Sequence, residues 1–361
     1  MKKILPFYDP KRSYNENYAK GPFGDFRISP KILLKKGNYE IFGIPIDIPF
    51  GIPAGPLVNS NFVKAAWDWG FSLSTYKTVR GNSLLVHPYP NIIRVISKTK
   101  DIHPGDTVLG DFNVNSINIE RDGITNSFGV PSKTPRVWQK DAKKALKKMT
   151  KGNTMILSFM GTNLKGMDRR DYIENFAKTC RLARQTGAPI LEVNFSCPNF
   201  GKEGLVCFDM HASHDILEAL AKAKGNIPLL VKIGYFGKQQ KEQLDKLLDS
   251  IHKFADGVVA VNTIPANVVN KKGEQALPGN PVRLSSGTCG ATIRWAGLEM
   301  AKYFVDYKKA KNWKDFVIIG VGGVITPKDY FKYMNLGVDA VQSATGAMWK
   351  PSLALEIRKE K

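Results

Sequence analysis

Short apolar runs alternate with amphipathic segments from about residue 45 to the end of the chain. Eight of these runs predict strands, and most are continuously apolar, as is typical of parallel strands covered on both faces. They are 48–54, 71–78, 155–160, 189–196, 228–233, 257–263, 316–321 and 339–344. Eight strands that alternate with helices predict a closed (β/α)8 barrel, with an open doubly wound sheet as the alternative.

Two of the intervening helices have clear signatures. In 239–255, leucine and isoleucine recur at the spacing of one helix face. Thr326 and Pro327 are typical of an N-cap and a first helical position, and Asp329 completes a capping pattern. Gly337 is placed to end that second helix.

Two segments do not follow the strand–helix alternation. Residues 1–44 are polar and aromatic, and they predict an N-terminal extension that packs on the barrel domain, 45–361. Residues 81–135 contain several prolines and glycines with little periodicity. Long insertions in compact domains often act as lids or interfaces, so this segment predicts a loop or small β-element over the C-terminal mouth.

Composition is compatible with one large cytoplasmic barrel. The chain has 361 residues, of which 43% are hydrophobic, and six are tryptophan. No run approaches 18 consecutive apolar residues, so no membrane span is expected. The first residues include two lysines but lack the apolar core of a signal peptide, which favours a cytoplasmic location.

The net charge of +21 raises the question of an anionic partner. The lysines are spread along the chain, and those that cluster lie at the spacing of one exposed helix face: Lys143, Lys144, Lys147 and Lys148. This pattern favours a solvated surface, and nucleic acid is not the expected partner.

Cysteine and histidine spacings predict no metal site. The four cysteines include no CxxC pair, and Cys180 falls on an apolar helix stripe. His211 and His214 lie three residues apart but lack a third ligand nearby.

The stretch 190–199, ILEVNFSCPN, carries the densest chemistry. It predicts a buried strand that ends at Pro198, with Asn194, Cys197 and Asn199 crowded at its C-terminal end. In a parallel barrel, that end is where substrates bind. Asparagine side chains suit a planar ligand with alternating C=O and N–H groups, and a thiol can act as a base or nucleophile.

Other strands also end in polar or glycine residues. Lys77 and Thr78 end the second strand, Lys232 the fifth, and Asn262 and Thr263 the sixth. A lysine at a buried strand end needs an anionic partner. Two further turns are rich in small residues and predict a phosphate cup: Gly322-Gly323 and Ala344-Thr345-Gly346. Together these features suggest flavin mononucleotide (FMN) beside a small heterocycle.

The motif LEVNFSCPN resembles the active-site signature of the dihydroorotate dehydrogenases and their dihydropyrimidine dehydrogenase relatives. Further stretches share the likeness: YKT, NSFGVPS, VKIG, VNTI, SGTCG and GVGG. The likeness extends from about Ile48 to Met348. It implies a (β/α)8 barrel with FMN at its C-terminal mouth and oxidation of (S)-dihydroorotate to orotate in de novo pyrimidine biosynthesis. Cys197 would be the base, with hydride transfer to flavin N5. A cysteine base resembles the soluble class.

The resemblance also implies roles for individual residues. Lys77 would lie beside flavin and substrate at the catalytic centre, and Lys232 would face the flavin N1/O2 edge. The positions that match pyrimidine-binding residues are Asn126, Asn194, Asn199, Asn262 and Thr263. Those that match flavin contacts are Ala54, Gly55, Thr78, Gly290, Gly322, Gly323, Ala344 and Thr345, with Asn262 shared between the two sets.

Some features leave alternatives open. Ser286 and Cys289 stand where the family pattern has glycines, in the loop before Gly290. The motifs YKT and SFMG are nearer the dihydropyrimidine dehydrogenase branch, whereas Asn199 and NSFGVP are of the dihydroorotate type. Uracil or thymine reduction, tRNA dihydrouridine synthesis and a non-catalytic barrel are the rival functions. Cys207 is a second candidate base or a lid residue. We expect a homodimer; the electron acceptor stays open between fumarate, a quinone and an electron-transfer partner subunit.

Overall fold

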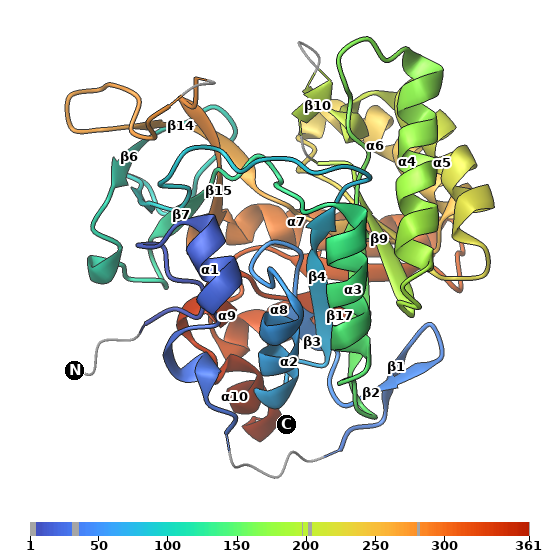
Figure 1. The fold of residues 1–361 in the computed structure, drawn as a ribbon, viewed down its shortest axis with the longest axis horizontal. Helices are drawn as coiled ribbons and strands as arrows, with labels where there is room; N and C mark the ends of the chain where they lie inside the picture. Colours follow the sequence, from blue (N-terminus) through green and yellow to red (C-terminus); the bar gives the residue numbers. More distant parts are fainter. Residues whose placement is uncertain (1–4, 31–35, 197, 201–203, 280–281, 361) are drawn as a thin grey trace.

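The computed structural model describes residues 5–30, 36–196, 198–200, 204–279 and 282–360. Its centre is a closed barrel of eight parallel strands (Figure 1). In chain order they are β3 (Phe50–Ile52), β4 (Leu73–Val79), β8 (Thr154–Phe159), β9 (Ile190–Asn194), β12 (Leu229–Lys232), β13 (Gly257–Ala260), β16 (Val317–Val321) and β17 (Ala340–Gln342). The last strand pairs with the first, Val341 opposite Phe50. The predicted (β/α)8 barrel is therefore confirmed, and the open sheet is wrong.

The longer helices pack around the outside of this barrel, and shorter ones cap its ends (Figure 1). They are α1 (Tyr14–Lys20), α2 (Ser60–Asp68), α3 (Pro135–Leu146), α4 (Arg169–Arg184), α5 (Met210–Lys224), α6 (Lys241–Phe254), α7 (Arg294–Ala310), α8 (Pro327–Leu336), α9 (Thr345–Trp349) and α10 (Leu353–Lys359). Single 3-10 turns are η1 (Gly24–Arg27), η2 (Val114–Ser116), η3 (Val206–Phe208), η4 (Lys238–Gln240) and η5 (Ala291–Ile293).

The predicted ends of α8 are confirmed. The Thr326 side chain accepts a hydrogen bond from the Asp329 backbone N–H, and the Asp329 carboxylate accepts one from the Thr326 N–H in return. Gly337 ends the helix at φ +98°, a left-handed conformation that glycine adopts without steric cost. Cys180 is buried in α4, as its place on the apolar stripe predicted.

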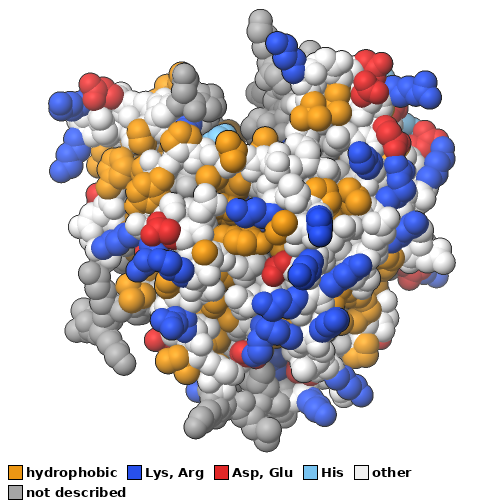
Figure 2. Space-filling view, in the orientation of Figure 1, with side chains coloured by type: hydrophobic (Ala, Val, Ile, Leu, Met, Phe, Trp, Pro, Cys, Tyr) orange, Lys and Arg blue, Asp and Glu red, His pale blue; other side chains and the backbone are white. Residues whose placement is uncertain are grey.

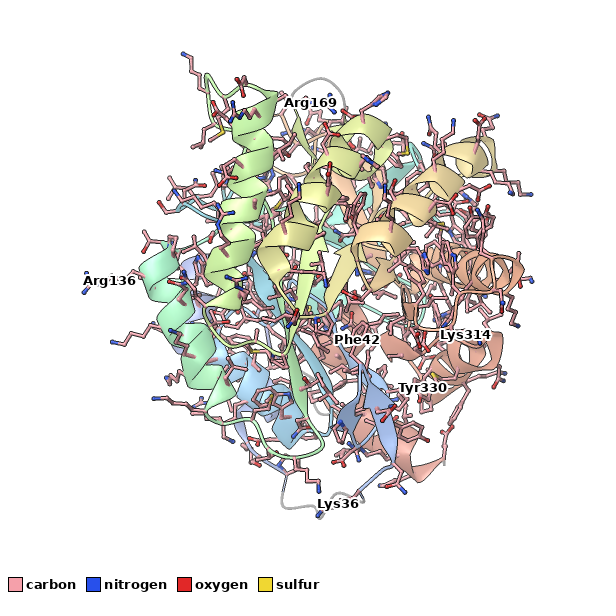
Figure 3. All side chains as sticks on the ribbon, turned by 90° about the vertical axis from the view of Figure 1, so that its right-hand side faces the viewer. Lys36, Phe42, Arg136, Arg169, Lys314 and Tyr330 are labelled. Carbon is pink, nitrogen blue, oxygen red and sulfur yellow. The ribbon has the colours of Figure 1, made fainter. Side chains whose placement is uncertain are left out.

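A two-stranded hairpin lies against the N-terminal end of the barrel. It consists of β1 (Tyr39–Ile41) and β2 (Ile44–Ile46), with Phe42 at its turn (Figure 3). Its isoleucines join the inward-facing residues of the barrel strands in one apolar cluster. This end of the barrel is therefore filled with side chains, which leaves the opposite end for a ligand.

A second, smaller barrel rises from the C-terminal mouth (Figure 1). Residues 81–135 supply β5 (Arg94–Ile96), β6 (Thr107–Asp111) and β7 (Gly123–Asn126). Two strands beyond β13 complete it, β14 (Ile264–Val269) and β15 (Ser285–Gly290). The hydrophobic pattern alone does not predict these two, because β15 reads SSGTCG and takes its stability from pairing with β7 and β14.

The N-terminal segment packs beside the small barrel, where α1 lies next to β7 (Figure 1). The Phe7 backbone N–H donates to the carbonyl of Met348, near the end of α9. Asn17 is fully buried, and its carboxamide bonds the backbone of Asp9, Arg12 and Ser13. These bonds fix the segment against the barrel.

Basic side chains gather on the surface over α3 (Figure 2). Lys143, Lys144, Lys147 and Lys148 are all exposed, as their helical spacing predicted. Among the residues that the structure describes, no helix is both long and apolar enough to cross a membrane.

Candidate active site

A cavity of about 280 Å³ opens at the C-terminal mouth of the large barrel, between the strand ends and the small barrel. Most of the predicted site residues line it: Ala54, Gly55, Lys77, Thr78, Asn126, Asn194, Lys232, Asn262, Thr263, Ala344 and Thr345. They come together because the strands are parallel and end at the same mouth. Cys197 lies outside the described residues, as does the side chain of Asn199, whose backbone belongs to β10 (Pro198–Phe200), paired with β11 (Gly204–Leu205).

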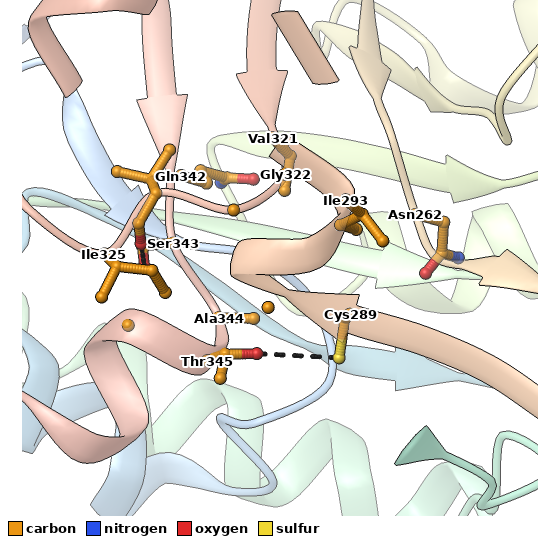
Figure 4. Close-up of a pocket in the computed structure, with 14 residues that line it drawn as sticks. Asn262, Cys289, Ile293, Val321, Gly322, Ile325, Gln342, Ser343, Ala344 and Thr345 are labelled. Carbon is orange, nitrogen blue, oxygen red and sulfur yellow. Dashed lines mark hydrogen bonds between the residues drawn. The ribbon is translucent and has the colours of Figure 1, made fainter. Parts of the chain in front are cut away.

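The predicted cup forms a smaller hollow that continues from this cavity (Figure 4). Gly290, Gly322 and Gly323 line it and all have positive φ, at +107°, +135° and +64°. A Cβ at Gly323 would lie 2.5 Å from the Cβ of Arg294. Such glycine turns expose backbone groups to a close ligand, as phosphate sites require.

Thr345 and Cys289 line both the cup and the cavity, at the place where the two adjoin. The Thr345 hydroxyl donates to the Cys289 sulfur at 3.7 Å (Figure 4). Burial raises the pKa of this thiol to about 11, against a smaller opposite effect of Thr345. Cys289 is therefore a neutral wall of the site at physiological pH.

Lys232 shares the buried floor of the cavity with Glu192, a residue that the sequence analysis did not single out. Burial lowers the pKa of Lys232 to about 8, while the Glu192 charge raises it. Burial raises the pKa of Glu192, and Lys232 and Ser158 oppose this. Neither Glu192 oxygen has a well-formed hydrogen bond with a described residue. A charged residue inside the apolar strand ILEVN was the signal that could have found it.

Asn194 and Asn262 are linked across the strand ends through Ser196. The Asn194 Oδ1 accepts from the Ser196 N–H at 3.0 Å and from its hydroxyl at 3.1 Å. The Asn262 Nδ2 donates to the same hydroxyl. This network fixes the orientation of both carboxamides before a ligand arrives, which lowers the entropy cost of binding.

The small barrel brings Asn126 and Thr263 to the same side of the cavity. Gly287 of β15 pairs with Asn126, the last residue of β7. A Cβ at Gly287 would lie 2.4 Å from the Thr263 hydroxyl oxygen. Glycine is therefore required where these strands and the loop after β13 meet.

Aromatic residues of the N-terminal segment form a wall that the sequence analysis did not assign to the site. Tyr8 and Tyr14 line the cavity, and each makes an edge contact with Phe128. The Lys77 Nζ lies 5.8 Å from the centre of the Tyr14 ring. Burial raises the pKa of both tyrosines, so they present neutral faces. A cation over such a ring is favoured, and Tyr14 thereby helps to hold Lys77 in place.

Cys207 belongs to the packed core rather than to a mobile lid, contrary to the lid alternative. It is fully buried in η3, and its N–H donates to the Phe195 carbonyl at 3.0 Å. It does not line the cavity. Burial raises the pKa of its thiol to about 12.

Comparisons with known proteins agree with this geometry. The family model for dihydroorotate dehydrogenase matches residues 109–360. A dihydroorotate dehydrogenase from Dictyostelium discoideum is 33% identical, over 97% of this chain and 96% of its own. A dihydroorotate dehydrogenase B (NAD(+)) catalytic subunit from Thermodesulfovibrio yellowstonii is 29% identical over 65% and 70% of the two chains, respectively. A dihydroorotate dehydrogenase (quinone) from Pseudarthrobacter chlorophenolicus is 25% identical over 88% and 83%. The chain therefore belongs to the dihydroorotate dehydrogenase family, a family of oxidoreductases that act on CH–CH donors.

Proposed function

We propose that this protein oxidises (S)-dihydroorotate to orotate in de novo pyrimidine biosynthesis, with FMN as its cofactor. One observation carries the proposal: a glycine-lined cup shares wall residues with a cavity that is lined by two buried lysines and several asparagines. A relative named dihydroorotate dehydrogenase matches the chain over nearly its whole length, which supports the same substrate.

The residues present fit FMN. Gly290, Gly322 and Gly323 would hold its phosphate, since a side chain at any of them would fill the cup or strain the backbone. Ala54, Gly55 and Thr78 would hold the ring system, in reach of Lys232. When bound, FMN supplies the hydride acceptor, at N5, that a CH–CH oxidation requires.

The chain would act on the substrate through a thiolate base, two lysine cations and a set of polar side chains, four asparagines and one threonine. Cys197, as a thiolate, would remove the C5 proton of dihydroorotate. Lys232 would stabilise the negative charge that accumulates at the N1/O2 edge of the cofactor. Lys77 would neutralise the substrate carboxylate. Asn126, Asn194, Asn199, Asn262 and Thr263 would read the polar edges of the pyrimidine.

We place the protein in the soluble, cysteine-base class, as a cytoplasmic homodimer. The cysteine at position 197 supports this placement. Reduction of uracil or thymine is the second candidate, because its uncharged substrates would use the same asparagines. The two candidates differ in the substrate carboxylate, and the cationic wall of the cavity favours the anionic substrate.

The purified protein is expected to be yellow and to carry about one FMN per barrel. Anaerobic addition of dihydroorotate should bleach the flavin absorbance, whereas dihydrouracil and dihydrothymine should bleach it far more slowly. Stopped-flow absorbance spectroscopy measures all three substrates on the same preparation. A colourless protein that FMN cannot reconstitute would end the flavoenzyme proposal. Faster bleaching by dihydrouracil would instead favour the second candidate.

Gly323→Ala is expected to weaken FMN binding by about 10- to 100-fold. Backbone strain at one residue costs about 1–3 kcal/mol, and each tenfold change in affinity corresponds to about 1.4 kcal/mol. The new Cβ would lie 2.5 Å from the Arg294 Cβ and would displace the cup. Gly166→Ala is the matched control, because Gly166 has φ +87° but no atom within 4 Å of the added Cβ. Fluorescence titration of FMN into the apoproteins compares them. Equal affinities in the two variants would place the phosphate elsewhere.

A further inference from the structure

Arg283 is a buried cation whose neighbours are all neutral. It precedes β15 and is 2% exposed. Its Nε donates to the Ser127 hydroxyl at 2.9 Å. Its Nη1 donates to the carbonyls of Pro88 and Pro278, and its Nη2 to those of Pro90 and Ser127, at 2.7–2.9 Å. All five N–H groups of the guanidinium are thus used, and none meets a carboxylate among the described residues.

This arrangement is costly unless a counter-charge completes it. Carbonyl oxygens fix the geometry of a guanidinium, but a buried charge without an opposite charge remains unfavourable. Arg283 therefore does more than join the three loops that it touches.

The anion belongs in the cavity. Ser127 and His87 both line the cavity, and Ser127 bonds Arg283 directly. Burial lowers the pKa of His87, and the Arg283 charge lowers it further, so that charge is felt at the cavity wall. Lys77 and Lys232 add two cations to the lining, against one carboxylate, Glu192.

The segment that Arg283 holds is also a predicted substrate contact. Ser127 follows Asn126, and the Ser127 N–H donates to the carbonyl of Asn91. Two Arg283 bonds hold the other polar atoms of Ser127, its hydroxyl and its carbonyl. Asn91 also donates to the Ser127 carbonyl, and Asn126 itself pairs with Gly287, so Arg283 shares with them the positioning of Asn126 at the cavity wall.

We propose that Arg283 is a positioning residue that holds Asn126 in place and whose buried charge selects pyrimidines bearing a carboxylate over uncharged ones. This inference rests on the proposed function and assigns the source of its preference for an anionic substrate. Arg283 acts through Ser127 and through its electric field, without touching the ligand. Since a positive charge at this depth is weakly screened, its removal should weaken binding of an anion specifically.

The test compares orotate with orotamide, its uncharged carboxamide analogue, as ligands of the FMN-loaded protein. Binding is followed by the change in the flavin absorption spectrum. Arg283→Met should weaken orotate binding by about tenfold or more, because the lost charge acts across a weakly screened interior, and orotamide binding by a smaller factor that reports the displacement of Asn126 alone. Arg283→Lys keeps the charge but loses the fork, and it should fall between wild type and Arg283→Met.

Two further outcomes are decisive. If both Arg283 variants lower the affinity for orotate and for orotamide by the same factor, the charge plays no part in selection and the inference is wrong. The inference is also wrong if the affinities for both ligands stay at the wild-type values. Should Arg283→Met not fold, Arg283→Gln also removes the charge but keeps a side-chain amide donor, and an unchanged ratio of orotate to orotamide affinity in that variant would also overturn it. A wild-type protein that binds neither ligand and is not bleached by dihydroorotate would tell against the proposed function instead.

Discussion

Cys197→Ala is expected to slow flavin reduction by dihydroorotate by about 10²–10⁴-fold, the usual contribution of a positioned general base. FMN and orotate should still bind, because the cup and the asparagine network do not depend on the thiol. Cys207→Ala is the matched control: its sulfur is buried away from the cavity, and burial raises its pKa to about 12. Single-turnover stopped-flow reduction under anaerobic conditions measures both variants.

Cys197→Ser refines this comparison. It should be partly active, with its activity displaced to higher pH, because an alcohol is harder to ionise than a thiol. Loss of flavin reduction in Cys207→Ala, with Cys197→Ala nearly normal, would move the base into the core. A Cys197→Ala variant that has lost FMN would show a structural role for this residue.

Lys232→Met is expected to slow flavin reduction by about 10²–10³-fold, the range seen when one charge-stabilising donor is removed. It should also lower the free energy of unfolding, because the buried Glu192 loses the positive charge that favours its ionised form. The double variant Lys232→Met/Glu192→Gln separates the two effects. Its thermal stability should return towards that of the wild type, while its flavin reduction should stay slow.

The pH dependence of kcat/KM gives an independent check on Lys232. Burial lowers the pKa of Lys232 to about 8, so its cation is present below that pH and is lost as the pH rises through it. The thiol base acts in the opposite direction, since its thiolate fraction rises with pH. The wild-type profile should therefore be bell-shaped, with a falling limb near pH 8 that is absent from Lys232→Met. A falling limb that persists in that variant would belong to another group.

The large barrel could be predicted from the sequence because each of its strands carries its own signal. Runs such as VIIGV and GVVA are apolar throughout, as is typical of parallel strands covered on both faces. The capping residues Thr326 and Gly337 act on their own helix, so their roles are equally local. Lys77, Lys232 and Asn194 were predicted for the site for the same reason, since each ends a recognisable strand.

What only the tertiary structure decided depends on contacts between distant parts of the chain. The strand β15 has no apolar pattern and exists because β7 and β14 flank it. Tyr14 lines the cavity only because the N-terminal segment packs beside it, and Arg283 is buried only because three loops converge on it. Local periodicity determines which segments form strands and helices, whereas the burial of a polar group depends on what packs against it, and that is decided by the whole fold.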